Sequence, residues 1–313
     1  MSGTQQCHLQ PLPDLQNDED KRGIEIGNVG ITNVLFPVKI RRMPVDGEKG
    51  FAPVSARTKL FVKLPKAYKG VNMSRFYECL NEFSEHVISS DTMPRLLTLL
   101  QTKLKSIDSY ARFEFDYYIN RKAPVSKLTA PQAYRCAFAG VDVAGEYTFI
   151  TEVNVIAASV CPCSREMSLL KNLNGELKTA AGKSSDYIRG VLDKEGAGEV
   201  SAVVGMGAHN QRSNIRVRVI GKDNKAPWIE ELVDMIEAQA SAPVYPILKR
   251  ADEKYVTEQG YKNAKFSEDI TRDVQLSLMH HSSIDSWSLR VFNEESIHPY
   301  DVTCYQQSDN WKF

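Results

Sequence analysis

Alternating hydrophobic and polar positions predict strands in the first half of the chain, and apolar residues at helical spacing predict two helices between them. The strands are expected where Val, Ile and Phe alternate with polar residues, and the helices where apolar residues recur every three to four positions. The predicted order is strand, strand, helix, helix, strand, strand, over residues 24–40, 55–64, 76–87, 94–104, 111–120 and 133–143.

The second half of the chain shows the same order of elements. They are predicted over residues 147–160, 214–220, 229–236, 266–278, 286–292 and 302–306. The residues themselves are not visibly duplicated, so the repeat is one of architecture only. We therefore predict an α+β protein with two units of similar order, residues 23–143 and 144–313.

Two segments lack such a pattern. Residues 1–22 are polar and contain proline, which predicts a flexible N-terminal tail. Residues from about 165 to 205 mix glycines with charges and are predicted to form an inserted loop, with one helix around Tyr187 to Leu192.

Charge balance and hydropathy exclude several classes of partner. Lys+Arg and Asp+Glu both number 39, so no net field attracts nucleic acid or an anionic membrane. No apolar run approaches the ~20 residues of a membrane helix, and the polar N-terminus does not resemble a secretory signal. Most of the six cysteines sit singly in apolar runs, which is typical of a reducing compartment. We predict a cytoplasmic protein.

The first candidate for chemistry is Cys161-Pro162-Cys163-Ser164, at the end of a long apolar strand. A thiolate is a strong ligand for zinc, and it is a nucleophile when the pKa of the thiol is lowered. The alternative is a pair of buried, inert cysteines, and the spacing alone does not decide between the two.

The second candidate is the stretch from Gly207 to Ser213, which places His209 beside two amides, the Arg212 guanidinium and a hydroxyl. Such a cluster suits metal ligation together with hydrogen bonding to a polar ring. The alternative is an ordinary polar turn that enters a strand.

Acidic residues between two predicted helices form the third candidate, and a loop histidine forms the fourth. Ser267 is expected to cap the helix that follows it, which leaves Glu268 in the first turn. An ionised carboxylate there can accept two parallel N–H bonds, such as those of the guanine N1–H and 2-amino edge. Helix capping without a ligand is the alternative, and a lone loop histidine such as His298 is more often solvated. The chain has no P-loop, no H-E-x-x-H and no G-x-S-x-G motif.

Taken in order, five stretches of the chain resemble the type IB GTP cyclohydrolases, which are enzymes of the tunnelling fold. Each stretch is short, but the ordered set covers most of the chain between about residues 30 and 305 and is highly specific. The stretches are Gly70–Phe76, Cys161–Glu166, Gly207–Ser213, Leu248–Glu258 and Phe266–Asp269.

The resemblance implies two tandem tunnelling-fold units that assemble as a homotetramer, each an antiparallel four-stranded sheet with a helix pair between its second and third strands. It also implies hydrolysis of GTP to 7,8-dihydroneopterin triphosphate and formate, the first step of tetrahydrofolate biosynthesis. Cys161 and His209 match catalytic residues, and with Glu253 and His298 they match the ligands of a divalent metal. Glu268 matches the residue that anchors the purine. Zinc, manganese or ferrous iron would suit such a mixed ligand set.

Four cations, Arg75, Arg212, Lys249 and Arg250, are candidates for binding the triphosphate of GTP. The chain departs from the family in one respect, because about forty residues separate the cysteine and histidine motifs. Since the entropy of closing a loop grows only logarithmically with its length, a site can still assemble across this insertion.

Two alternatives to a cyclohydrolase remain open at this point. One is the tunnelling-fold nitrile reductase of queuosine synthesis, which uses a cysteine, a purine-anchoring glutamate and a nicotinamide cofactor but no metal. The histidine motif and His298 favour metal-dependent hydrolysis over that enzyme. The other alternative is a non-catalytic zinc- or pterin-binding scaffold, for which a closed four-ligand metal site is expected.

Overall fold

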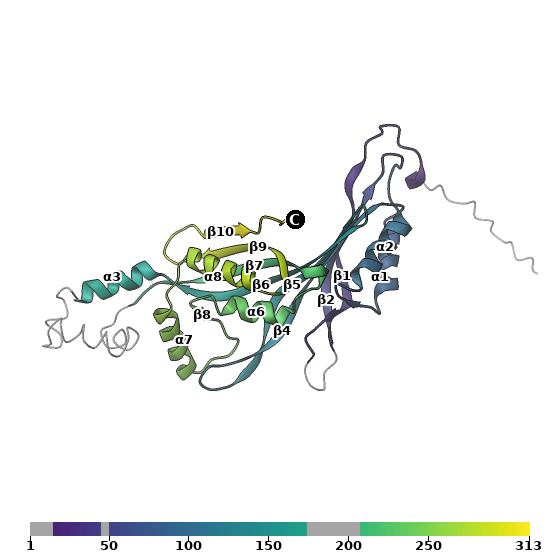
Figure 1. Cartoon of the computed structure of the whole chain (residues 1–313). Coiled ribbons are helices and arrows are strands. Elements are labelled where there is room, and N and C mark those ends of the chain that lie inside the picture. The colour runs from purple at the N-terminus through teal and green to yellow at the C-terminus, as the bar shows by residue number, and fades with distance from the viewer. Residues whose placement is uncertain (1–14, 45–49, 174–206) are drawn as a thin grey trace, which may run out of the picture.

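The computed structural model describes residues 15–44, 50–173 and 207–313, and its helices are arranged along one ten-stranded sheet (Figure 1). The strands lie in the order β10-β9-β7-β6-β5-β4-β2-β1-β3, and the two-residue β8 pairs with β6. The strands are β1 (Ile26–Arg41), β2 (Phe51–Leu64), β3 (Val87–Ile88), β4 (Asp108–Lys122), β5 (Thr129–Val143), β6 (Glu146–Val160), β7 (Asn210–Gly221), β8 (Ala242–Pro243), β9 (Ile284–Glu294) and β10 (Val302–Gln307).

Two groups of four antiparallel strands follow one another in this sheet. In the first group β1, β2, β4 and β5 pair in succession, and in the second group β6, β7, β9 and β10 do the same. The hairpin between β5 and β6 joins the groups through backbone pairs that run from Val143–Glu146 to Arg135–Asn154. The predicted α+β class and the order of the strands in both halves are confirmed.

Helices follow the second strand of each group. The first group has α1 and α2 between β2 and β4, and the second has α6, α7 and α8 between β7 and β9. Figure 1 shows α1 and α2 at one end of the sheet, α6 and α8 beside the other half, and α3 extending away from the sheet. The helices are α1 (Ser74–Phe83), α2 (Met93–Leu104), α3 (Pro162–Leu173), α6 (Ile229–Glu237), α7 (Arg250–Lys262) and α8 (Ser267–His280). Among the described residues, no helix is both long and apolar enough to cross a bilayer.

Apolar side chains of the helices cover one face of the sheet. In α2, Leu96, Leu97 and Leu100 are fully buried, and each contributes about 1.5–3 kcal/mol relative to an exposed side chain. The close approach of α2 to β5 requires a glycine, because a Cβ added at Gly140 would lie 2.3 Å from Met93 Cγ. Packing of this kind explains why the helical spacing in the sequence identified α2.

Charged hydrogen bonds hold α6 against strands of the first group. The buried Tyr134 of β5 donates its hydroxyl to Glu237 Oε1 at 2.5 Å and accepts a hydrogen bond from Arg121 Nε at 2.7 Å. Arg121 of β4 also binds Glu237 Oε2 at 3.0 Å and Asp234 at 2.7 Å. Because α6 belongs to the second half of the chain, this cluster connects the two halves directly.

The other face of the sheet is charged at its centre. Glu152 of β6 is 7% exposed, and its carboxylate lies 3.0 Å from Arg112 Nη1 and 2.8 Å from Arg216 Nη2. Burial raises the pKa of Glu152, but hydrogen bonds from Arg216 and Arg112 outweigh burial and hold that pKa below its ordinary value. An ionised carboxylate among arginines therefore lies at the centre of this face, which also carries a small apolar cluster of Ala139, Ile150, Ile220 and Trp311.

Two helices differ from the sequence predictions. Helix α7 was not predicted, because it buries only Asp252, Gly260 and Tyr261 and so has no apolar stripe at helical spacing. Helix α8 begins at Ser267, but its N-cap position is Phe266, whose N–H is accepted by the Asp269 carboxylate at 3.1 Å. Ser267 is therefore not the cap.

The two segments without a sequence pattern are described only in part. Pro162–Leu173 are helical, where an inserted loop was expected from about residue 165, and the helix expected around 187–192 lies outside the described residues. Of the tail predicted over residues 1–22, Leu15–Asn17 form a 3₁₀ turn and Glu19 forms a β-bridge with Tyr68. Residues 1–14 also lie outside the described part of the chain.

Candidate active site

The register of two central strands brings the cysteine and histidine motifs together. β6 and β7 pair without a break from Ile150–Ile220 to Val160–Asn210, so Cys161 and His209 are the next residues on either side. The Cys161 N–H donates to the His209 carbonyl at 3.1 Å and continues the ladder by one bond. The two motifs are therefore neighbours through strand pairing, whatever the length of the chain between them.

Cys161 directly precedes α3, and its sulfur lies at the start of that helix. The Ser164 N–H donates to Cys161 Sγ at 3.5 Å, which is the position of a side-chain acceptor at a helix N-cap. The Ser164 hydroxyl donates to the Cys161 carbonyl and accepts from the His209 N–H, both at 3.2 Å. Ser164 thus binds both motifs and limits how far the sulfur can move from the imidazole.

The imidazole of His209 is held through one nitrogen. Its Nδ1 lies 3.0 Å from Gln211 Nε2, 3.4 Å from Ser296 Oγ and 3.5 Å from Glu295 Oε1. Gln211 follows on β7, whereas Glu295 and Ser296 follow the end of β9. Within the described part of the chain Nε2 has no such contact, so Nε2 is the nitrogen left for a ligand.

Glu295 is the residue of this site that the sequence analysis missed. Its carboxylate accepts Gln211 Nε2 at 3.0 and 3.2 Å and the Ser296 and Ile297 N–H groups at 2.8 and 3.4 Å. Burial raises the pKa of Glu295, but these hydrogen bonds outweigh burial and lower the pKa below its ordinary value. Its place three residues before His298 was the only signal in the sequence.

Glu268 belongs to a segment that contacts the end of β6. The Lys265 N–H donates to the Val160 carbonyl at 3.1 Å, so the chain enters α8 beside the residue that precedes Cys161. Glu268 is exposed in the first turn of α8 and accepts the Ser267 hydroxyl at 3.0 Å. Its carboxylate is therefore accessible to a ligand.

Glu253 is exposed near the start of α7, and it is the other end of α7 that touches β6. A Cβ added at Gly260 would lie 3.2 Å from Val160 Cγ2. Glu253 precedes Gly260 by seven residues, which is about 10 Å along a helix. Glu253 therefore lies about two helical turns from the residue of α7 that touches β6.

The neighbour of Glu253 has a structural role. The fully buried Asp252 accepts the N–H groups of Val125 at 2.7 Å, Ser126 at 2.8 Å and Lys249 at 2.9 Å. Burial raises the pKa of Asp252, but these hydrogen bonds hold it well below its ordinary value. Asp252 thus attaches the β4–β5 turn to the start of α7.

His298 is exposed in the loop between β9 and β10, and its ring stacks on Tyr300 with centroids 5.0 Å apart. It follows Ser296, whose hydroxyl contacts His209, by two residues. In the described part of the chain, no three His, Cys, Asp or Glu side chains are close enough together to hold a metal ion. The four predicted ligands are therefore not gathered within one protomer, although Cys161 and His209 adjoin.

A divalent cation suits the part of the ligand set that does adjoin. A thiol and an imidazole are good ligands for zinc and its first-row neighbours. The imidazole is held at Nδ1, and among the described residues Nε2 has no hydrogen-bond partner, so Nε2 is the nitrogen that can reach a metal. Cys161 and His209 therefore fit such a cation chemically, and further ligands must come from elsewhere.

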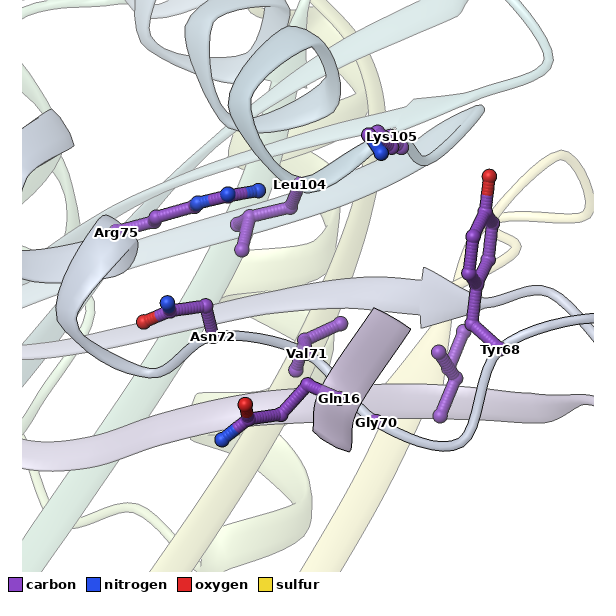
Figure 2. Close-up of a pocket in the computed structure, with 9 residues that line it drawn as sticks. Gln16, Tyr68, Gly70, Val71, Asn72, Arg75, Leu104 and Lys105 are labelled. Atoms are coloured by element: carbon purple, nitrogen blue, oxygen red, sulfur yellow. The ribbon is translucent and has the colours of Figure 1, made fainter. Parts of the chain in front are cut away.

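The predicted triphosphate ligands are carried by three different parts of the fold, with Arg250 at the start of α7. Arg75, near the start of α1, lines a pocket of about 10 Å³ with Asn72 and Lys105, and donates to the Lys103 carbonyl at 3.0 Å (Figure 2). Figure 1 shows α1 and the Cys161 end of β6 in opposite halves of the molecule. Arg212 is exposed on β7, and Lys249 is exposed immediately before α7.

Comparisons of the sequence with known proteins agree on one family. A family model described as type I GTP cyclohydrolase folE2 matches residues 12–304. GTP cyclohydrolase FolE2 of Geobacter sulfurreducens is 36% identical over 301 residues, which cover 96% of this chain and 100% of the relative. The FolE2 protein of Syntrophus aciditrophicus is 36% identical over 296 residues, covering 95% and 99%. Among solved structures, uricase from Arthrobacter globiformis aligns with a TM-score of 0.48 at 5% identity, covering 92% of this chain and 96% of that one.

Neither a nitrile reductase nor a non-catalytic scaffold is supported by these relatives. The family model covers both halves of the sheet and all of the motifs that carried the resemblance. On the match to this model and on the identity to curated relatives along nearly the whole chain, the protein belongs to the type I GTP cyclohydrolase FolE2 family.

Proposed function

We propose that this protein hydrolyses GTP to 7,8-dihydroneopterin triphosphate and formate, the first step of tetrahydrofolate biosynthesis. The observation that carries the proposal is the junction of β6 and β7, where Cys161 and the anchored imidazole of His209 adjoin in a family of GTP cyclohydrolases. The segment that bears Glu268 contacts the same strand end.

Each of these residues has a distinct part in the proposal. Glu268 accepts the N1–H and 2-amino groups of guanine, which orients the purine next to Cys161. Cys161 and His209 are catalytic, and with Glu253 and His298 they hold a divalent metal such as zinc, manganese or iron. When bound, this metal supplies Lewis acidity that makes water a nucleophile near neutral pH. His209 and His298 also move protons in this proposal, through an imidazole nitrogen that the metal leaves free.

We propose further that the complete site forms between copies of the chain in a homotetramer. Helix α1, which carries Arg75, lies in the opposite half of the molecule from the end of β6 that leads to Cys161 (Figure 1), so in binding triphosphate Arg75 would act on the site of a neighbouring copy. Arg212, Lys249 and Arg250 are the other candidate triphosphate ligands. Among the described residues of one chain, no three of the four predicted ligands come together, which favours the same arrangement.

The element order supports a further structural assignment, to two tandem tunnelling-fold units with boundaries near residues 23–143 and 144–313. Each group of four antiparallel strands has its helices between the second and third strands. We place the protein in the cytoplasm on the basis of its cysteine usage.

The activity is tested by incubating the protein, reconstituted separately with zinc, manganese and iron, with GTP. Formate and a pterin that fluoresces after oxidation are the expected products, and His209→Ala should abolish both. No product with any of the three metals would refute the proposed activity. Mass measurement in solution tests the tetramer, and a monomer that turns over GTP would contradict the shared site.

A further inference from the structure

Three groups of different chemistry surround Nδ1 of His209. The Gln211 amide nitrogen is a donor at 3.0 Å, the Glu295 carboxylate is an acceptor at 3.5 Å, and the Ser296 hydroxyl at 3.4 Å can be either. A neutral imidazole carries one proton, so Nδ1 cannot satisfy both the donor and the acceptor at once.

The orientation of the Gln211 amide follows from its other neighbours. Its nitrogen lies within 3.2 Å of both Glu295 oxygens, and an ionised carboxylate can only accept. Its oxygen accepts the Ser159 hydroxyl at 3.3 Å. The second N–H of the amide therefore points at Nδ1, which accepts it, and the proton of the ring is on Nε2.

A cation at Nε2 reverses these requirements. That nitrogen must then be free of its proton, which places the proton on Nδ1 and makes Nδ1 a donor. Gln211 presents only its amide nitrogen, a donor, to Nδ1, whereas Glu295 Oε1 is an acceptor. The Glu295 carboxylate is already fixed there by the Ser296 and Ile297 N–H groups, and its side chain is 9% exposed.

We propose that Glu295 is a positioning residue for His209, which accepts the Nδ1 proton and so presents Nε2 to a divalent cation. Gln211 stabilises the opposite tautomer, that of the metal-free ring. Glu295 and Gln211, which both contact Nδ1, thus have opposite effects on the affinity of His209 for a metal ion. The proposal rests on the proposed function only in taking His209 as a metal ligand.

The test is titration of the full-length, metal-free protein with cobalt(II), followed by the absorption of the bound ion. Glu295→Gln, which keeps the size of the side chain but removes its charge, should weaken cobalt binding by about 10- to 100-fold, the range for residues that support a metal-binding histidine. Gln211→Met, which removes the amide donor, should bind cobalt as tightly as the wild type or more tightly. Glu294→Gln, a change of the exposed neighbouring carboxylate, is the matched control and should not alter binding.

Two controls, the Glu295→Asp variant and the melting temperature of each metal-free variant, test whether weak cobalt binding results from misfolding. Asp keeps the charge but is shorter, so it should also bind cobalt weakly in a protein that melts like the wild type. Equal cobalt affinity of Glu295→Gln and wild type would overturn the proposal, as would equal losses in Glu295→Gln and Gln211→Met. Undiminished cobalt binding by His209→Ala, or none by the wild type, would overturn it as well. Cobalt binding with the predicted order of variants, but without formate release from GTP, would refute the proposed activity and support the role of Glu295.

Discussion

Replacement of Tyr134 by Phe tests the charged cluster that connects the two halves of the chain. The substitution removes one hydroxyl and leaves the ring, so the packing of β5 is preserved. Two hydrogen bonds are lost, one from the hydroxyl to Glu237 Oε1 at 2.5 Å and one from Arg121 Nε to the hydroxyl at 2.7 Å. Both involve charged groups, and Tyr134 and Glu237 are 1% and 8% exposed.

The expected loss of unfolding free energy is about 2–3 kcal/mol. A net hydrogen bond to a charged group contributes roughly 1.5–3 kcal/mol, but Arg121 retains its ion pair with Glu237 at 3.0 Å, which compensates part of the double loss. With an unfolding entropy of about 2.1 cal/mol/K per residue over 313 residues, this loss corresponds to a fall in melting temperature of about 3–5 °C.

The effect should also depend on pH with a defined sign. Burial holds the pKa of Glu237 above its ordinary value, and the Tyr134 hydroxyl opposes that rise. Without the hydroxyl the folded-state pKa is higher still, so the folded variant binds its proton more tightly than the unfolded chain does. Stability from a raised pKa is present below the unfolded value of about 4.3 and is lost as pH increases through the folded value. The deficit of the variant should therefore be larger at pH 7 than at pH 4.5.

Calorimetric and urea unfolding at both pH values measure this difference. Tyr118→Phe is the control, because Tyr118 is 60% exposed on the neighbouring β4 and loses no buried hydrogen bond. If Tyr134→Phe is no less stable than Tyr118→Phe, or if its deficit grows on acidification, the reasoning about this cluster is refuted.

Three further predictions concern the site and its surroundings. Asp252→Asn should melt below the wild type and be cleaved faster by protease in the β4–β5 turn. Because the pKa of Asp252 is depressed in the folded protein, the difference in melting temperature between wild type and variant should narrow as pH falls below about 4. A difference that stays constant with pH would contradict this. Cys161→Ala should melt within about 3 °C of the wild type, because it loses only the long hydrogen bond from the Ser164 N–H to the sulfur. The same variant should release no formate from GTP. A variant that unfolds or dissociates would indicate a structural metal instead. Tyr261→Phe should match or exceed wild-type thermal stability, because this buried hydroxyl has no hydrogen-bond partner within the described residues, and a clear fall in melting temperature would show that it has one.

The sequence predicted the strands well because their alternation is strict where one face of the sheet is buried. In β4 the residues Ala111, Phe113, Phe115 and Tyr117 all point into the core, and the polar residues between them do not. Helix α7 has no such pattern and was missed, since its stability comes from Asp252 and from the contact of Gly260 with β6 rather than from an apolar stripe. Only tertiary packing identifies a helix of this kind.

The candidate site was predictable in its residue types but not in its geometry. The sequence singled out Cys161 and His209, and the structure places them side by side. Glu295 could not be found in this way, because its contact with His209 depends on the pairing of β9 with β7, across 84 residues of chain from Gln211. The metal-site assignment of Glu253 and His298 stays a prediction, since the described residues of one chain hold no cluster of three such side chains.

The pairing register of β6 and β7 fixes the position of the Cys161 thiol relative to the His209 imidazole. In a strand, successive side chains point to opposite sides, so moving β7 along β6 by one residue would turn His209 away from Cys161. A single extra residue near the start of β7 should therefore be more harmful than many extra residues in the connection that precedes it. The length of that connection can change at little entropic cost, as long as the count of residues along the two strands is kept.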